Sequence, residues 1–148
     1  MLYFNRNLKK SIILTLSCLL LVSCHVFDDA KHALNYFCPK LKIGVNGVHE
    51  HSSKTFTLAV KSYVINYPDQ YEKQVDEYFG TANGYAPIAN AEVYSVNTDL
   101  DTYVDGNDNI IGKGFKSGRD TAIVAFNKTK QQIIIIEYLK NPKAKKGE

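Results

Sequence analysis

Two histidines separated by one residue are the first side chains in this sequence with an evident chemistry. His49 and His51 flank Glu50, so in an extended chain both imidazoles point to the same side. With a third ligand, such a pair can bind zinc or copper. No third ligand follows in register, so a solvated turn over Gly47–Ser53 explains these residues more simply. We therefore expect no metal and no other cofactor, and His49 and His51 are only the candidate ligands if a metal does bind.

The stretch from Asp99 to Asn109 carries carboxylates and amides that could bind calcium. An EF-hand loop needs oxygen ligands at positions 1, 3 and 5 and a glycine at position 6. Counting from Asp101 puts Tyr103 at position 3, and counting from Asp105 puts Ile110 at position 6. Both registers fail, so we interpret the stretch as a turn that uses Asp-Gly and Asn for its backbone angles.

Known enzyme motifs are absent from the sequence. Gly112-Lys113-Gly114 lacks the spacing of a phosphate-binding loop, and no helix is expected after it. There is no Gly-x-Ser-x-Gly, no HExxH and no clear nucleophile–base pair. We expect a protein that is not an enzyme, and the sequence identifies no small-molecule substrate.

The first 24 residues have the order of charge, apolar core and cysteine that marks an exported lipoprotein. A basic start at residues 6–10 precedes an apolar stretch over 12–21, which is shorter than the about 20 residues that span a bilayer. Leu21-Val22-Ser23-Cys24 resembles the lipobox of bacterial lipoproteins. The resemblance implies that residues 1–23 are a signal peptide and that Cys24 carries covalent lipid, whose acyl chains hold the mature chain on the bilayer.

A transmembrane anchor and an ordinary cleaved signal fit these residues less well. The charges at residues 28–31 follow too soon for an anchor, an Ala-x-Ala-like site is missing, and Cys18 lacks the aliphatic residue that a lipobox requires. Cys24 is followed by His25, not by the aspartate that commonly retains such proteins on the inner membrane. The resemblance therefore implies a lipoprotein of the outer membrane that faces the periplasm.

The mature chain is electrically balanced. The sequence has 18 basic and 15 acidic side chains, and three of the basic ones lie in the signal, which leaves 15 of each. Nucleic-acid binding needs a basic face, so a nucleic-acid partner is not expected. Residues 141–148 are expected to be a basic, flexible tail, with contact to anionic lipid or peptidoglycan as the alternative.

Cys38 is a lone cysteine once the signal and the lipobox are set aside. In an oxidising compartment it has no partner within the mature chain. Because Tyr36, Phe37 and Pro39 surround it, we expect a buried, unreactive thiol, with a disulfide to another chain as the alternative.

The remaining residues predict a single globular periplasmic domain over 41–140, preceded by a lipidated N-terminus and tether over 24–40. An amphipathic helix is expected over Pro68–Phe79, because Tyr71 and Val75 begin a stripe that continues at helical spacing. Strands are expected at residues 41–45, 55–67, 92–96, 110–116, 121–126 and 131–139. The last two strands should form a hairpin with a four-residue loop.

Two of these strands predict a sheet that is covered on both faces. Thr55–Tyr67 has Val60 and Val64 on one face and Tyr63 and Ile65 on the other, and the run 133–136 is apolar on both. The expected fold is mainly β, a β-sandwich with one packed amphipathic helix. The alternative is an α+β fold with the helix on one sheet face.

The later part of the chain resembles the type VI secretion lipoprotein TssJ. The resemblance rests on Ala91–Val96, the acidic stretch through Asp108, and Ala122–Phe126 before a final strand. The tryptophan usual in that family's final strand is missing, because this chain has none. The resemblance implies a transthyretin-like β-sandwich that grips the periplasmic domain of an inner-membrane partner with loops at one end.

By that implication, the loops Gly47–Ser53 and Thr81–Ala89 form the surface that binds the partner. The candidate partner-binding residues are Gly47, His49, His51, Tyr85 and Pro87. We therefore expect a membrane-anchored lipoprotein that acts as a non-enzymatic scaffold or anchor of an envelope protein complex, with a type VI secretion membrane complex as the specific case. Two alternatives stay open: a ligand- or metal-binding lipoprotein, and an immunity or exclusion lipoprotein that blocks a surface receptor.

Overall fold

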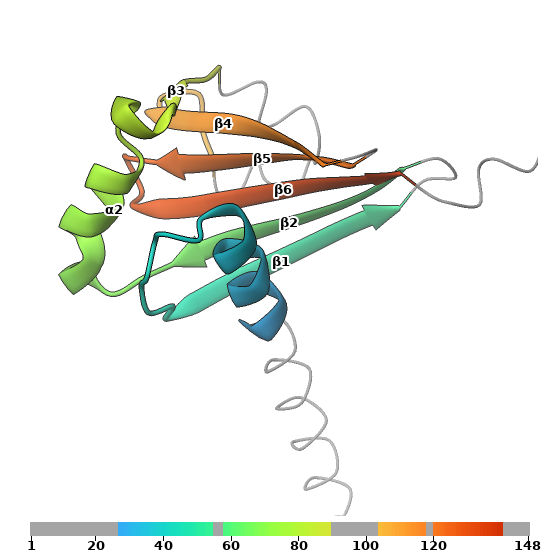
Figure 1. Cartoon of the computed structure of the whole chain (residues 1–148), viewed down its shortest axis with the longest axis horizontal. Coiled ribbons are helices and arrows are strands. Elements are labelled where there is room, and N and C mark those ends of the chain that lie inside the picture. Colours follow the sequence, from blue (N-terminus) through green and yellow to red (C-terminus); the bar gives the residue numbers. More distant parts are fainter. Residues whose placement is uncertain (1–26, 55–57, 90–103, 118–119, 141–148) are drawn as a thin grey trace, which may run out of the picture.

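The computed structural model describes residues 27–54, 58–89, 104–117 and 120–140. Within them, six strands form one antiparallel sheet in the order β1-β2-β6-β5-β4-β3 (Figure 1). The strands are β1 (Gly47–Lys54), β2 (Leu58–Asn66), β3 (Ala86–Pro87), β4 (Ile110–Ser117), β5 (Asp120–Asn127) and β6 (Gln132–Lys140). The hairpin of β5 and β6 matches the expectation from the sequence.

Two helices accompany the sheet in the described residues. One, called here the N-terminal helix, spans residues 27–37 and crosses one face of the sheet (Figure 1). The other is α2 (Glu72–Tyr78), which follows the 3-10 turn η1 (Asp69–Tyr71) and precedes the 3-10 turn η2 (Thr81–Asn83). The prediction of a mainly β fold with a packed amphipathic helix is confirmed, in the form of one sheet with helices against one face.

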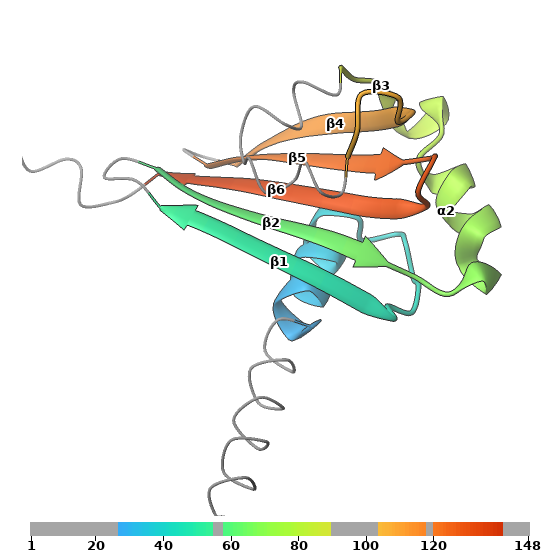
Figure 2. The same cartoon turned by 180° about the vertical axis from the view of Figure 1, so that it is seen from behind.

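Four consecutive isoleucines in β6 decide how the sheet is covered. Ile133–Ile136 are all 0% exposed, and alternate members belong to clusters on opposite faces. The helix-side cluster takes Ile133 and Ile135, and it also contains Leu34, Tyr63, Val75, Phe79 and Phe126. The far-side cluster takes Ile134 and Ile136, and it also contains Val60, Val64, Val104, Ile110 and Ala125. Residues 104–109 cross the far face of the sheet (Figure 2).

Residues 27–37, which the sequence analysis assigns to a tether, instead form a helix that belongs to the folded domain. Ala30, Ala33, Leu34 and Phe37 recur at the spacing of one helical face, and the first three are buried. The small alanine side chains let the helix approach the sheet closely. The folded domain therefore includes residues 27–40, which precede the expected boundary at residue 41. No helix in the described residues is long and apolar enough to cross a membrane.

The segment before β2 also differs from the expectation. A strand is expected at 41–45 and a turn at Gly47–Ser53, whereas 41–46 is an irregular connection and β1 begins at Gly47. The Asn46 N–H donates to the Asn66 carbonyl at 3.1 Å, which aligns β1 with β2. β1 is an edge strand whose composition is mostly polar, so its sequence lacks the apolar alternation that predicts a strand. The strand expected at 92–96 lies outside the described residues.

A buried carboxylate joins the acidic turn to the β5–β6 hairpin. Asp108 Oδ2 accepts hydrogen bonds from the Asp105 N–H at 2.9 Å and from the Asn127 amide at 2.7 Å, and it lies 3.2 Å from Lys130 Nζ. Burial opposes its charge, but these donors outweigh burial and lower the pKa of Asp108. The Asn107 N–H donates to Asp105 Oδ1 at 2.8 Å, which is the expected turn geometry.

The packing of the N-terminal helix predicts that it contributes to stability. Leu34→Ala should destabilise the fold by about 2–5 kcal/mol, because it removes buried methyl groups and leaves a cavity. Asn35→Ala, on the exposed side of the same helix, should change stability by less than about 0.5 kcal/mol. Thermal and denaturant unfolding followed by circular dichroism would measure both. Equal stability of Leu34→Ala and wild type would mean that the helix is not part of the cooperative unit.

The lowered pKa of Asp108 predicts a pH-dependent contribution to stability. A carboxylate whose pKa is lower in the folded state stabilises the fold above its unfolded pKa of about 4, and the contribution is lost as pH falls through the folded pKa. Asp108→Asn should therefore melt below wild type near neutral pH, and the gap should narrow below about pH 4. Asp69→Asn, at an exposed position of η1, is the matched control and should show no such trend. A gap that stays constant down to acid pH would contradict this account.

Candidate functional site

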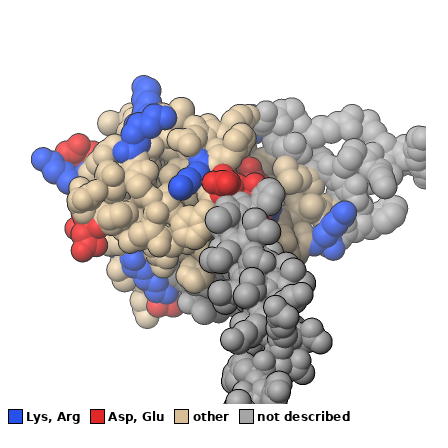
Figure 3. Space-filling view, turned by 90° about the horizontal axis from the view of Figure 1, so that it is seen from below, with Lys and Arg blue, Asp and Glu red and all other residues tan. Residues whose placement is uncertain are grey.

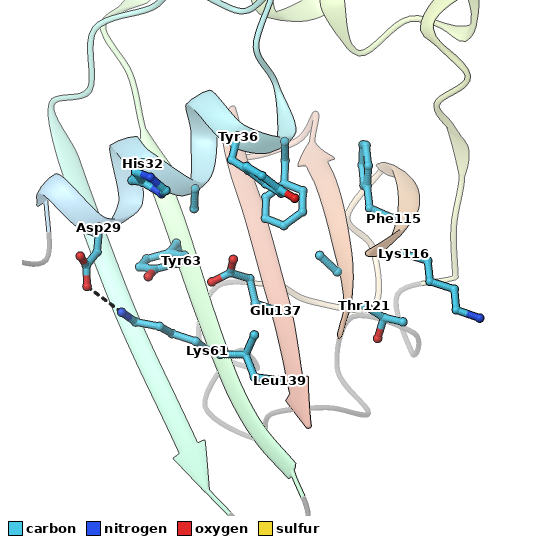
Figure 4. Close-up of a pocket in the computed structure, with 13 residues that line it drawn as sticks. Asp29, His32, Tyr36, Lys61, Tyr63, Phe115, Lys116, Thr121, Glu137 and Leu139 are labelled. Carbon is cyan, nitrogen blue, oxygen red and sulfur yellow. Dashed lines mark hydrogen bonds and ion pairs between the residues drawn. The ribbon is translucent and has the colours of Figure 1, made fainter. Parts of the chain in front are cut away.

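The N-terminal helix covers only part of its sheet face. Figure 1 shows that β2, β6 and β5 continue past the helix on the side away from α2. A pocket of about 650 Å³ lies between the helix and this part of the sheet. Its walls are Asp29, His32, Ala33, Tyr36 and Phe37 from the helix, Lys61 and Tyr63 from β2, Glu137 and Leu139 from β6, Thr121 and Ala122 from β5, and Phe115 and Lys116 from β4 (Figure 4).

Strand register brings the floor of this pocket together. Lys61 and Tyr63 are two residues apart on β2, so both point to the helix side. Lys61 pairs with Glu137 across β2 and β6, and Phe115 pairs with Ala122 across β4 and β5. Paired residues in an antiparallel sheet share a face, which places charged and aromatic side chains from four strands around one opening.

Lys61 is the polar centre of the pocket. Its Nζ donates to Asp29 Oδ2 at 2.7 Å and lies 3.4 Å from Glu50 Oε1, so one ammonium joins the helix to β2 and β1. The same nitrogen lies 5.2 Å from the centre of the Tyr63 ring. Burial works against the charge, yet the hydrogen bond to Asp29 and the neighbouring Tyr63 and Glu50 raise the pKa of Lys61. Burial also raises the pKa of Tyr63, and the charges of Glu137 and Glu50 add to this while Lys61 opposes it.

Aromatic and aliphatic side chains form the rest of the wall. The Phe37 ring lies 4.9 Å from the Tyr36 ring and 5.5 Å from the Phe115 ring, both in edge contacts. Among the described residues, the large hydrophobic side chains that are exposed are Tyr36, at 60%, and Leu139, at 39%. Both line this pocket. Exposed apolar area is thus concentrated where the sheet face is open, as at sites that bind another molecule.

This arrangement is suited to binding. Lysine is an ammonium ion near neutral pH, and the contacts of Lys61 raise its pKa further, so it is unsuited to act as a nucleophile or a general base. Acidic and basic side chains are intermixed over a mostly uncharged surface on the side seen in Figure 3. The pocket therefore offers aromatic contact and local charge, and it opens to solvent beside Tyr36 and Leu139.

The histidine pair lies on the opposite face of the sheet. His49 and His51 are on β1, paired with Val64 and Ser62, so they point to the far side and away from the pocket. Within the described residues, no third His, Cys, Asp or Glu joins them in a group that could hold a metal ion. Gly47 begins the same strand, in a position where an added Cβ would meet the Asn66 amide at 3.1 Å.

The other two partner-binding candidates, Tyr85 and Pro87, are not brought near β1. Tyr85 is only 3% exposed, with its ring 4.7 Å from the Phe79 ring, so it is a core residue and not part of a docking surface. Pro87 is exposed on β3, which lies at the opposite edge of the sheet from β1. The five partner-binding candidates from the sequence therefore do not form one surface, because two of their strands lie at opposite edges and one side chain is buried.

Cys38 is buried beside two tyrosines at the end of the N-terminal helix. Its Sγ lies 3.8 Å from the Tyr85 hydroxyl. Burial raises the pKa of the thiol, with the Tyr85 and Tyr78 hydroxyls acting against it. Burial in turn raises the pKa of Tyr78 to about 12. The expectation of a buried thiol is confirmed.

Cys24 and residues 141–148 lie outside the described residues.

Sequence reasoning missed the pocket for identifiable reasons. The stripe of Ala30, Ala33, Leu34 and Phe37 was a usable signal for a helix. The meeting of β2, β6, β5 and β4 at one opening has no local signal, because it depends on strand order and register.

Comparison with known proteins assigns neither a family nor a function to this chain. Comparison of the chain with known protein families, with curated proteins and with solved structures finds no match.

The environment of Cys38 predicts slow alkylation of the folded protein. Iodoacetamide should modify this thiol at least about 100-fold more slowly in the native state than in denaturant, since labelling requires the buried cluster to open. Mass spectrometry of timed samples would measure both rates. Rapid native labelling, or a disulfide-linked dimer on a non-reducing gel, would contradict burial and favour the intermolecular disulfide.

Proposed function

We propose that this chain is a membrane-anchored lipoprotein that binds another envelope protein and serves as a non-enzymatic scaffold or anchor. The lipobox-like Leu21-Val22-Ser23-Cys24 supports the anchor, with the protein on the outer membrane facing the periplasm. The type VI secretion membrane complex stays the specific assembly that the TssJ resemblance suggests.

One observation carries the proposal: residue 27, three positions after the lipobox cysteine, already lies in a helix of the folded domain. Only residues 25 and 26 separate it from Cys24 in the sequence. An extended chain rises about 3.3–3.6 Å per residue, so Cys24 and residue 27 are at most about 11 Å apart. The helix in turn is fixed to the sheet by Ala30, Ala33 and Leu34. A domain held this closely keeps a restricted orientation at the membrane surface, which lowers the orientational cost of binding a partner in the same envelope.

The pocket supplies the surface that suits a protein partner. Tyr36 and Leu139 are exposed beside it, and charged side chains surround the apolar wall. Aromatic residues inside a polar rim are the usual composition of protein interfaces. The same pocket also favours the second candidate function, a lipoprotein that binds a small ligand, because its volume lies within the range of ligand sites.

In-cell crosslinking tests the proposal. A photoreactive benzoylphenylalanine placed at Tyr36 should capture an envelope protein, whereas the same group at Asp76, on the exposed side of α2, should not. Cys24→Ala should abolish acylation and capture together. Cys18→Ala is the matched control and should preserve both, because it is not the lipobox cysteine.

Two results would overturn the proposal. Capture of nothing, or of a second copy only, from Tyr36 would remove the scaffold function. Retention of the acylated, membrane-bound form in Cys24→Ala would remove the assignment of the anchor.

A further inference from the structure

We infer that the edge strand β1 lies against the headgroup layer of the membrane that holds Cys24, so that the sheet stands on this edge with β3 farthest from the bilayer. The inference rests on the proposed function, because it requires an acylated Cys24. It assigns β1 to the lipid surface and leaves the pocket beside Tyr36 to the partner protein.

The N-terminal helix crosses the strands with its first turn on the β1 side. In that turn, Asp29 accepts a hydrogen bond at 2.7 Å from Lys61 of β2, which pairs with Ser52 of β1. In the last turn, the Phe37 ring lies 5.5 Å from the Phe115 ring of β4. Figure 1 shows the same course, with the first residues of the helix beside β1. The end of the helix that is nearest in sequence to the lipobox therefore lies at the β1 edge.

The reach of the chain before the helix is short compared with the width of the sheet. Cys24 and residue 27 are at most about 11 Å apart. Neighbouring strands lie about 4.8 Å apart, so the sheet order places β3 about 24 Å from β1. An anchor with this reach brings the bilayer to β1, whereas β3 stays clear of it in an upright sheet.

The two edges of the sheet differ in their protection. β3 has two residues, one of them Pro87, and short strands and prolines keep an edge from pairing with another chain. β1 pairs eight consecutive residues with β2 and has no bulge, and no strand in the described residues pairs with its outer edge. A hydrated headgroup layer can hydrogen-bond such an edge and also keep other chains from it.

The exposed side chains of β1 suit an acidic lipid surface. They are polar, none is acidic, and they comprise His49, Ser52, Ser53 and Lys54. The one carboxylate of the strand, Glu50, is only partly exposed and lies 3.4 Å from Lys61 Nζ. Acidic headgroups attract basic side chains close to the membrane, which favours contact through this strand.

A bilayer on the outer side of the N-terminal helix is the competing orientation. The exposed residues on that side include Asp28 and Lys31, whose charges offset each other. The attraction to acidic headgroups is therefore weaker there than along β1.

Electron paramagnetic resonance tests the inference on the full-length acylated protein in nanodiscs that contain phosphatidylglycerol and a nickel-chelating lipid. Nitroxides are placed singly at Ser53→Cys, Ala86→Cys and Asn35→Cys, which report on β1, β3 and the outer side of the helix. Collision with nickel at the headgroups should be at least about fivefold greater at Ser53 than at either other position, because β3 lies about 24 Å away. Wild type treated identically measures any label on Cys38, and nanodiscs without nickel give the baseline.

A charge-neutral variant tests the contribution of the headgroups. Lys54→Gln should lower the nickel collision rate at Ser53 by about twofold in acidic nanodiscs, because it removes an attractive charge. Lys73→Gln, exposed on α2, is the matched control and should leave that rate unchanged. Equal rates at Ser53 and Ala86, a higher rate at Asn35, or an unaffected Lys54→Gln would each overturn the inference.

The same labels separate the other occupants of the edge. Dipolar coupling between Ser53 nitroxides on two copies, lost on dilution with unlabelled protein, would show that β1 pairs with a second copy and would overturn the inference. Capture of a partner from Tyr36 while Ser53 stays away from the headgroups would retain the proposed function and reject only this orientation. Absence of lipid on Cys24 in the mass spectrum of the preparation would reject both.

Discussion

The burial of β6 on both faces is the constraint from which the rest of the structure follows. Each isoleucine in Ile133–Ile136 is removed from water, which contributes about 1.5–3 kcal/mol per side chain. A single sheet can achieve this only if something packs on each face. Helix residues such as Leu34 and Phe79 cover one face, and Val104 with its neighbours contributes to the other. The sheet order places β6 between β2 and β5, so its backbone groups are also paired on both sides.

Covering this face with one short helix leaves an opening beside the helix. The N-terminal helix buries Ala30, Ala33 and Leu34, and it ends where Cys38 packs on Tyr85. Past the helix, the same face of the sheet carries Lys61 and Glu137, whose charges keep that part of the sheet hydrated. The pocket is thus the boundary between the apolar half of the sheet face and its polar half. The Asp29–Lys61 ion pair closes this boundary on one side and fixes the helix over it.

Under the proposed function, this boundary also connects the lipid anchor to the binding surface. Residue 27 of the helix that lines the pocket is three positions after Cys24, so an acylated Cys24 would hold the pocket close to the membrane surface. A domain on a long tether would have no such fixed geometry. If Cys24 is acylated as proposed, the short link gives the surface around the exposed Tyr36 and Leu139 a restricted orientation, which is the property that the proposed scaffold needs.

The sequence by itself determined the features that depend on local pattern. The alternation in Thr55–Tyr67 and the isoleucine run placed side chains on the correct faces, the stripe containing Val75 and Phe79 identified α2, and the polar composition around Asn127–Lys130 identified the hairpin loop. These features follow from the two-residue repeat of a strand or the 3.6-residue repeat of a helix, and both repeats can be recognised in consecutive residues. Tertiary structure alone decided the pocket, because Asp29, Lys61, Phe115 and Glu137 meet only through strand order and register. It also decided that His49 and Tyr85 lie apart, on the far face and in the core, since the burial of a residue depends on what packs over it and not on its neighbours in the chain.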